Sequence, residues 1–148
     1  GDGSVLIGCN ALGHLAAGIF ELQRTGDDTS GLEWKRTRQN GVNTLAFRAV
    51  QDRTFFAVDA DCVGLANAGA VPWEKNRQWL DLVARSGTPL FVSWRRQLAG
   101  PDERKALREA FLRASQSAPT AEPLDWMETD APKRWRFGDD VVTYDWDD

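Results

Sequence analysis

Residues 55–62 read FFAVDADC, and this stretch decides the predicted fold. It is apolar except towards its carboxyl end, which predicts a β-strand. Successive side chains of a strand point to opposite faces, so every second residue from Phe56 shares one face. The opposite face becomes acidic only at its carboxyl end, where it carries Asp59 and Asp61. Because α/β folds hold their chemistry at the carboxyl ends of strands, we expect a functional site there.

Three further strands are predicted on either side of this one. They lie at residues 5–9, 19–24 and 89–94, and the first reads as a strand buried on both faces. The predicted helices lie within residues 12–18, over residues 31–40, after Pro72, and after Gly100-Pro101. Four strand-then-helix units in a row imply a parallel sheet covered by helices, so the predicted fold class is α/β.

The helix over residues 31–40 is predicted from signals at both of its ends. Ser30 is followed three residues later by Glu33, a pattern typical of the reciprocal cap that starts a helix. Asn40-Gly41 supplies a left-handed stop at the other end. Residues 44–47 are then expected to connect this helix to the strand at 55–62.

The composition changes after residue 115, where prolines alternate with tryptophans. The residues on either side of Gly138 predict a β-hairpin. We therefore expect two units. Residues 1–118 would form the α/β unit, and residues 119–148 a linker with a β-hairpin. A chain that starts at a buried strand and ends inside a hairpin is expected to be a piece of something larger.

Composition and charge exclude several classes of function. The chain has 148 residues, of which 42% are hydrophobic and 27% charged, and its net charge of −4 makes nucleic acid an unexpected partner. No apolar run approaches the roughly 18 residues that a bilayer crossing needs, so no membrane association is expected. Two cysteines and one histidine cannot build a zinc cluster, and no glycine-rich phosphate loop follows a strand. We expect neither a metal nor a cofactor.

Four stretches of the sequence carry a resemblance to a known family. They read RTGDDTSG at 24–31, FFAVDADCVG at 55–64, WLD at 79–81 and SGTPLFVS at 86–93. With them, the chain from about residue 4 to its end resembles the C-terminal half of the catalytic barrel of α-galactosidase-like glycoside hydrolases, the melibiase clan. The resemblance implies that residues 1–118 are the C-terminal half of the catalytic barrel, with four consecutive βα units of a TIM-type (β/α)8 barrel, strands five to eight. Residues 119–148 would then be a linker and the first hairpin of a C-terminal β domain.

The resemblance also implies a catalytic residue. In that clan an arginine lies four residues before an aspartate at the end of the sixth strand, and this aspartate is the general acid/base. The matching pair here is Arg24 and Asp28. The nucleophile of the clan is an aspartate at the end of the fourth strand, a segment that this sequence does not contain. Retaining hydrolysis needs two carboxyl groups, so the chain alone is expected to be inactive.

Other residues at or near the predicted strand ends are expected to bind the sugar. They are Cys9, Asn10, Arg24, Asp27, Asp59, Asp61, Trp73 and Trp94. For the two tryptophans, the expectation is that the ring stacks on the face of a pyranose.

Structural roles remain open for several of these residues. Asp27 or Ser30 can cap the following helix. Asp59 and Asp61 can bind backbone amides of the next loop, or pair with Arg48 or Arg53. Cys9 can be a small buried filler. Cys9 and Cys62 are predicted to be free thiols, because another strand separates the strands that carry them.

Three functions are weighed against one another. The first is a fragment of a retaining glycoside hydrolase for α-galactoside-type substrates that carries the acid/base but not the nucleophile. The second is a non-catalytic carbohydrate-binding or interaction module derived from such a barrel. The third is a stable fragment without a function of its own. The expected partners are a carbohydrate substrate and either the missing N-terminal half of the barrel or a second copy in a homodimer, because open strand edges favour pairing.

Overall fold

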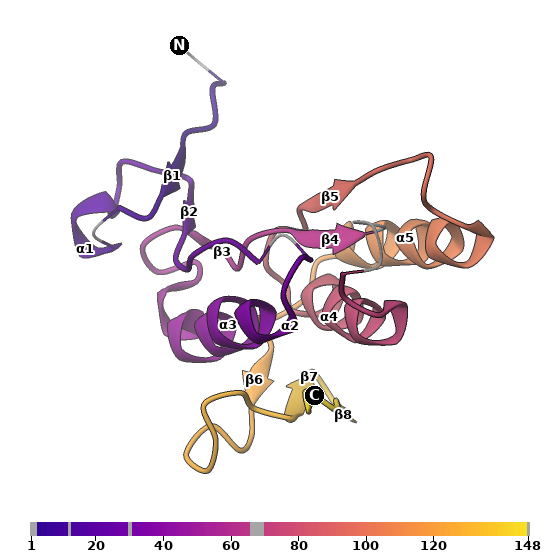
Figure 1. Cartoon of the computed structure of the whole chain (residues 1–148). Helices are drawn as coiled ribbons and strands as arrows, with labels where there is room; N and C mark the ends of the chain where they lie inside the picture. Colours follow the sequence, from indigo (N-terminus) through magenta and orange to yellow (C-terminus); the bar gives the residue numbers. More distant parts are fainter. Residues whose placement is uncertain (1–2, 12, 30, 66–69, 148) are drawn as a thin grey trace.

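Short strands and helices follow one another along the chain (Figure 1). The computed structural model describes residues 3–11, 13–29, 31–65 and 70–147, and Ser30 of the predicted cap lies outside them. The first elements are β1 (Ile7–Cys9), α1 (Gly13–Ala16), β2 (Leu22–Arg24), α2 (Trp34–Arg36), the π-helix η1 (Thr37–Val42), α3 (Asn43–Arg48), the 3-10 helix η2 (Ala49–Gln51) and β3 (Ala57–Asp59). They are followed by β4 (Val63–Leu65), α4 (Trp73–Arg85), β5 (Val92–Trp94), α5 (Pro101–Ala114), β6 (Glu122–Pro123), β7 (Arg134–Phe137) and β8 (Asp140–Thr143).

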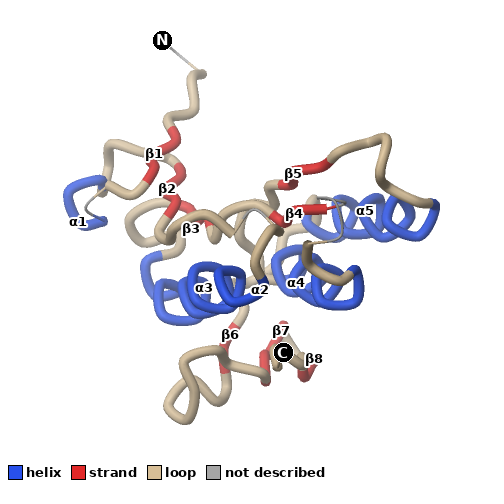
Figure 2. Tube along the Cα trace, in the orientation of Figure 1, coloured by secondary structure: helices blue, strands red, loops and turns tan. Residues whose placement is uncertain are grey.

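The strands form three small sheets (Figure 2). β1, β2 and β3 are parallel neighbours in that order, β4 pairs with β5 in parallel, and β6, β7 and β8 form an antiparallel sheet. No closed barrel is present in the part of the chain that the structure describes. The predicted four consecutive βα units of a (β/α)8 barrel are therefore wrong, and the chain is a small mixed α/β structure.

The prediction of one strand over residues 55–62 holds only for residues 57–59 and fails at both ends. β3 ends at Asp59 and pairs with β2, whereas β4 begins at Val63 and pairs with β5. Between them the φ angle of Asp61 is 70°, in the left-handed region that interrupts a strand. The strand therefore stops before this residue, and the next strand, which begins directly after the stretch, belongs to a different sheet. The hydrophobic pattern does not indicate the turn, because Asp59 and Asp61 keep the parity of a continuous strand.

The outer strand β1 differs from its prediction in burial. Val5, Leu6 and Ile7 are 61%, 51% and 55% exposed, so the expectation of a strand buried on both faces is wrong. β1 has a paired strand on one side only, β2, and an apolar run cannot by itself show how many neighbours a strand has. The faces of β3 agree with their prediction, because Phe56, Val58 and Ala60 are all buried.

The helix predicted over residues 31–40 is longer than expected and begins later. It starts at Trp34, and Glu33 at its N-cap makes no capping hydrogen bond with its side chain. It then continues through Gly41 as η1 and α3, so residues 44–47 are helical and not a connection. Gly41 is buried, and a Cβ added there would lie 2.8 Å from the indole of Trp79. The glycine therefore allows a close approach between two helices, and does not end one.

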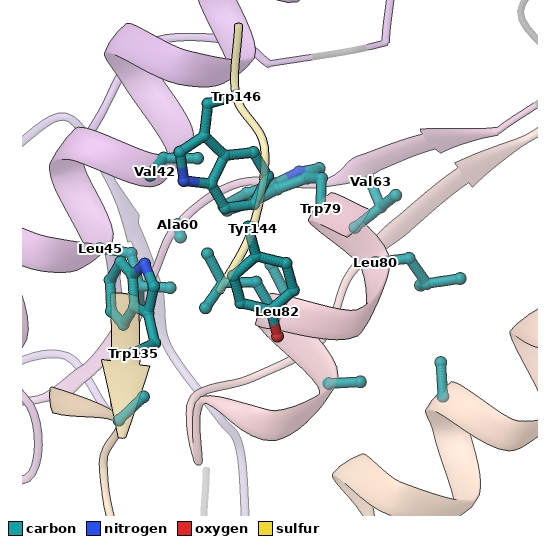
Figure 3. Close-up of a cluster of buried hydrophobic side chains, with 14 of the residues drawn as sticks. Val42, Leu45, Ala60, Val63, Trp79, Leu80, Leu82, Trp135, Tyr144 and Trp146 are labelled. Carbon is teal, nitrogen blue, oxygen red and sulfur yellow. The ribbon is translucent and has the colours of Figure 1, made fainter. Parts of the chain in front are cut away.

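The core lies between helices α3 and α4, strand β4 and the C-terminal segment (Figure 3). Trp79 of α4 is fully buried, and it shares this core with Trp135 and Trp146. The indole N–H groups of Trp135 and Trp146 both donate to the carbonyl of Pro132, at 2.7 and 2.6 Å. The predicted hairpin is present as β7 and β8. It packs on the same core as the helices that precede it, and the boundary after residue 118 stays a prediction.

Helices α4 and α5 pack against each other beside β4 (Figure 1). Pro72 directly precedes α4, and Pro101 occupies the first turn of α5, as predicted for both. Within the described ranges, no helix is both long and apolar enough to cross a membrane.

Candidate functional site

Polar side chains gather at the carboxyl ends of the three parallel strands. The strand register places Cys9 of β1 opposite Arg24 of β2, and Arg24 opposite Asp59 of β3. Paired residues of parallel strands point to the same face, so these three side chains form a row across the sheet. The loops that follow β2 and β3 add Asp28 and Asp61 to it.

Arg24 is the centre of this cluster. Its Nη1 lies 2.7 Å from Asp28 Oδ1 and 3.4 Å from Asp61 Oδ1. With the amide of Asn10 oriented to satisfy both of its polar atoms, its oxygen accepts from Arg24 Nη2 at 3.2 Å and its nitrogen donates to the Gly26 carbonyl at 2.7 Å. Burial disfavours the charged guanidinium, but the hydrogen bond to Asp28 and the charge of Asp61 outweigh it, so the pKa of Arg24 lies above its usual value.

Asp61 connects the loop after β2 to the end of β3. Its Oδ2 accepts the backbone N–H of Thr29 at 2.7 Å, and its Oδ1 faces Arg24. The Thr29 hydroxyl lies 3.1 Å from the same Oδ2 and donates to the carbonyl of Cys62. Both carboxylate oxygens of Asp61 therefore already have partners within the protein.

Asp59 is a buried carboxylate, only 6% exposed. Its Oδ1 accepts the backbone N–H of Asp61 at 2.8 Å. Burial raises its pKa and the charge of Asp61 adds to the effect, while the hydrogen bond from the Asp61 amide and the charge of Arg24 oppose it. Among the described residues, Asp59 and Asp61 form no ion pair with Arg48 or Arg53, and Arg53 instead binds Asp52 and two backbone carbonyls.

Asp27 is exposed and supports the loop that carries Asp28. Its Oδ1 accepts the backbone N–H of Asp28 at 2.8 Å, and its Oδ2 pairs with Arg36 of α2 at 2.8 Å. The hydrogen bond from the Asp28 amide, helped by the charge of Arg36, lowers the pKa of Asp27. Asp27 therefore does not cap the first turn of α2 through a backbone amide, the structural role weighed for it.

Asp28 is the most accessible carboxylate that contacts Arg24. Its side chain is 57% exposed, compared with 13% for Asp61. Cys9 is also exposed, so it is not the buried filler of the alternative prediction, and both cysteines are free thiols as predicted. A sugar hydroxyl can reach the carboxylate of Asp28 without a rearrangement of the buried residues beneath it.

Trp73 and Trp94 lie in the other part of the molecule. Trp94 belongs to β5 and Trp73 begins α4, and both are half-buried against the hydrophobic core. Across the described residues, no hydrogen bond, ion pair or ring contact joins either indole to Arg24 or its carboxylates. Stacking of these two rings on a sugar stays a prediction.

Sequence reasoning missed Thr29, whose side chain is fully buried beside Asp28. Its hydroxyl is bonded to a residue 33 positions further along the chain, and nothing in the local pattern indicates such a partner. The structure also contains an apolar groove of about 370 Å³, lined by Phe47, Val50, Pro123 and Trp126 among others and by none of the residues that contact Arg24. In the described part of the chain, no three His, Cys, Asp or Glu side chains are placed to hold a metal ion.

Comparison of the sequence with models of protein families gives no match, and comparison with curated proteins gives none either. The site must therefore be interpreted from its own geometry. It combines one exposed carboxylate, a cation beside it, and two carboxylates that are already bonded to the protein.

Proposed function

We propose that this chain provides the acid/base part of a retaining glycoside hydrolase that acts on α-galactoside-type substrates. The observation that carries the proposal is the Arg24–Asp28 pair at 2.7 Å, at the carboxyl end of the central strand of a parallel sheet, with the Asp28 carboxylate open to solvent. The resemblance of residues 24–31 to the melibiase clan supports the same role for Asp28.

Asp28 would donate a proton to the glycosidic oxygen as its bond to the anomeric carbon breaks, and then take a proton from the attacking water. Arg24 holds one oxygen of Asp28, and it can also bind a sugar hydroxyl. Asn10 and Cys9, which flank Arg24, would line the same end of the sheet.

The second carboxylate of a retaining mechanism is not supplied by Asp59 or Asp61. Asp59 is buried and bonded to a backbone amide, and Asp61 is bonded through both oxygens. A nucleophile must reach the anomeric carbon with a free oxygen. We therefore expect the nucleophile to come from residues other than these, and we expect no hydrolysis of aryl α-galactosides by this chain alone.

An external nucleophile provides the test. Azide would take the place of the missing carboxylate and attack the anomeric carbon, forming a C–N bond. At the same time the bond between the anomeric carbon and the glycosidic oxygen breaks, and Asp28 protonates this departing oxygen. We expect azide-dependent formation of β-galactosyl azide from phenyl α-galactoside. We expect Asp28→Ala to abolish it, whereas a dinitrophenyl substrate, whose leaving group needs no proton, is much less affected.

Asp139→Asn is the matched control, because Asp139 is an exposed aspartate in the turn of the β7–β8 hairpin. This variant is expected to react like the wild type. Two results would contradict the proposal: hydrolysis by the chain without azide that disappears in Asp28→Ala, or equal losses for the phenyl and dinitrophenyl substrates.

A second candidate function is carbohydrate binding without catalysis. It is favoured by the same commitment of Asp59 and Asp61 to the protein, which leaves one accessible carboxylate beside a cation. Galactose binding that depends on Asp28, together with no azide product from either substrate, would select this function over the first.

A further inference from the structure

We propose that Thr29 is the positioning residue for Asp28: it ties the loop after β2 to the end of β3 and so holds the acid/base carboxylate in place. This inference rests on the proposed function, because it gives Asp28 the catalytic role. It gives a role to Thr29, which stands next to Asp28 in the sequence but is not one of the Arg24–Asp28 pair.

The contacts of Thr29 are those of an anchor. Its side chain is fully buried, although the preceding residue, Asp28, is largely exposed. Its backbone N–H donates to Asp61 Oδ2 at 2.7 Å, and its hydroxyl donates to the carbonyl of Cys62. One residue therefore makes two bonds to the segment between β3 and β4.

Asp61 links this anchor to the partner of Asp28. The oxygen that Thr29 does not use lies 3.4 Å from Arg24 Nη1, the same nitrogen that binds Asp28. The backbone of the loop after β2 and the guanidinium of Arg24 are thus both held by the carboxylate of Asp61. Small errors in the placement of a catalytic group reduce rates strongly, about a hundredfold for a displacement of about 1 Å.

The methyl group of Thr29 has a separate, structural role. A Cβ added at Gly41 would lie 3.1 Å from Thr29 Cγ2, so the methyl packs beside the helical segment at Gly41. Valine keeps a methyl in this place and removes the hydroxyl. Serine keeps the hydroxyl and removes the methyl. These two variants separate positioning through the hydrogen bond from packing.

The experiment measures azide-dependent galactosyl transfer by Thr29→Val and Thr29→Ser with phenyl and dinitrophenyl α-galactosides. We expect Thr29→Val to lower the rate with the phenyl substrate by about tenfold, the usual effect of a lost hydrogen bond between one and two kcal/mol in strength. With the dinitrophenyl substrate, which does not need the acid, the change should stay within about twofold. Thr29→Ser should resemble the wild type.

Two results would overturn the inference. One is an equal loss of rate with both substrates, and the other is a loss of rate in Thr29→Ser as large as in Thr29→Val. In either case the packing of the side chain would explain the loss without the hydrogen bond. Asp61→Asn is the second variant, and it should show the same selective loss with the phenyl substrate.

A nuclear magnetic resonance readout keeps the inference separate from the proposed function. Exchange of the Arg24 guanidinium protons with water should become several-fold faster in Thr29→Val and stay unchanged in Thr29→Ser. If the wild type gave no azide product, the proposed function would fail. An unchanged exchange rate in Thr29→Val would refute the anchor, whatever the outcome of the azide assay.

Discussion

The fold makes the charged form of the Asp59 carboxylate unfavourable, because this side chain is buried. Its burial raises its pKa above the ordinary value, and the neighbouring charge of Asp61 acts in the same direction. A raised pKa means that the folded chain holds this proton more tightly than the unfolded chain does. The stabilisation is complete below the unfolded pKa and is lost as the pH rises through the folded pKa.

We therefore predict that Asp59→Asn is more stable relative to the wild type at pH 7 than at pH 3. The asparagine oxygen can still accept the N–H of Asp61, and the variant carries no charge to bury. Urea unfolding at the two pH values measures the difference. A relative stability that is higher at pH 3 than at pH 7 would show that the attraction of Arg24 outweighs the cost of burial.

At the scale of residues, strand-end reasoning predicted much of the cluster. Asp59 and Asp61 were expected at the carboxyl end of their strand, in a functional site. The structure places Asp59 opposite Arg24 in the strand register and Asp61 in the following loop, where it contacts Arg24. The arginines weighed as their partners, Arg48 and Arg53, were the wrong ones.

Thr29 was not found. Its role depends on the carbonyl of Cys62 between β3 and β4, and the sequence around a threonine carries no signal for a distant backbone acceptor.

At the scale of elements, Gly41 shows why a helix was cut short in the prediction. Asn-Gly is a common helix stop, because glycine tolerates the left-handed conformation. Here the helical path continues through Gly41, and the missing side chain makes room for Trp79. A local pattern cannot distinguish a glycine that ends a helix from one that admits a neighbour.

We predict that Gly41→Ala destabilises the chain. Alanine favours a helix over glycine by about 1 kcal/mol. The new Cβ would however lie 2.8 and 2.9 Å from two ring atoms of the fully buried Trp79, and overpacking of this kind costs about 1–3 kcal/mol. The clash should win by a small margin, lowering the urea midpoint.

Gln39→Ala, at an exposed position two residues earlier in the same helix, is the control for helix propensity. It should leave the stability unchanged or raise it slightly. A Gly41→Ala variant that is as stable as Gln39→Ala would mean that Trp79 moves aside without cost.

At the scale of the whole molecule, the sequence predicted one parallel sheet and did not indicate that the strands form three separate sheets. The left-handed backbone at Asp61 divides one apolar stretch between two sheets. The same residue binds Arg24 and Thr29. Sequence patterns are least informative at residues whose backbone conformation is required by a functional site. Asp61 is such a residue, and the predicted parallel sheet is interrupted there.

We predict that the chain associates through β1, forming a homodimer. This strand has one neighbour among the described strands, and three successive apolar side chains on and before it are more than half exposed. An open apolar edge of this kind favours pairing with a second copy. Sedimentation velocity at micromolar concentration should show a species of twice 16.5 kDa.

Ile7→Lys should shift this species towards the monomer, because a lysine on an edge strand opposes strand pairing. Ile7 is 55% exposed, so the substitution leaves the core intact. A wild type that sediments only as a compact monomer would refute the association.

The hydrogen bond from the indole of Trp34 to the carbonyl of Trp146 joins residues 112 positions apart. During synthesis, α2 leaves the ribosome long before its partner has been made. At elongation rates of about 5 to 20 residues per second, the delay is about 6 to 22 seconds. Throughout this interval the apolar side of the helices that the C-terminal tryptophans later cover is open to water. The nascent chain is therefore open to aggregation for a time that the ribosome sets, and slower translation of the residues between Trp34 and Trp146 would lengthen this time.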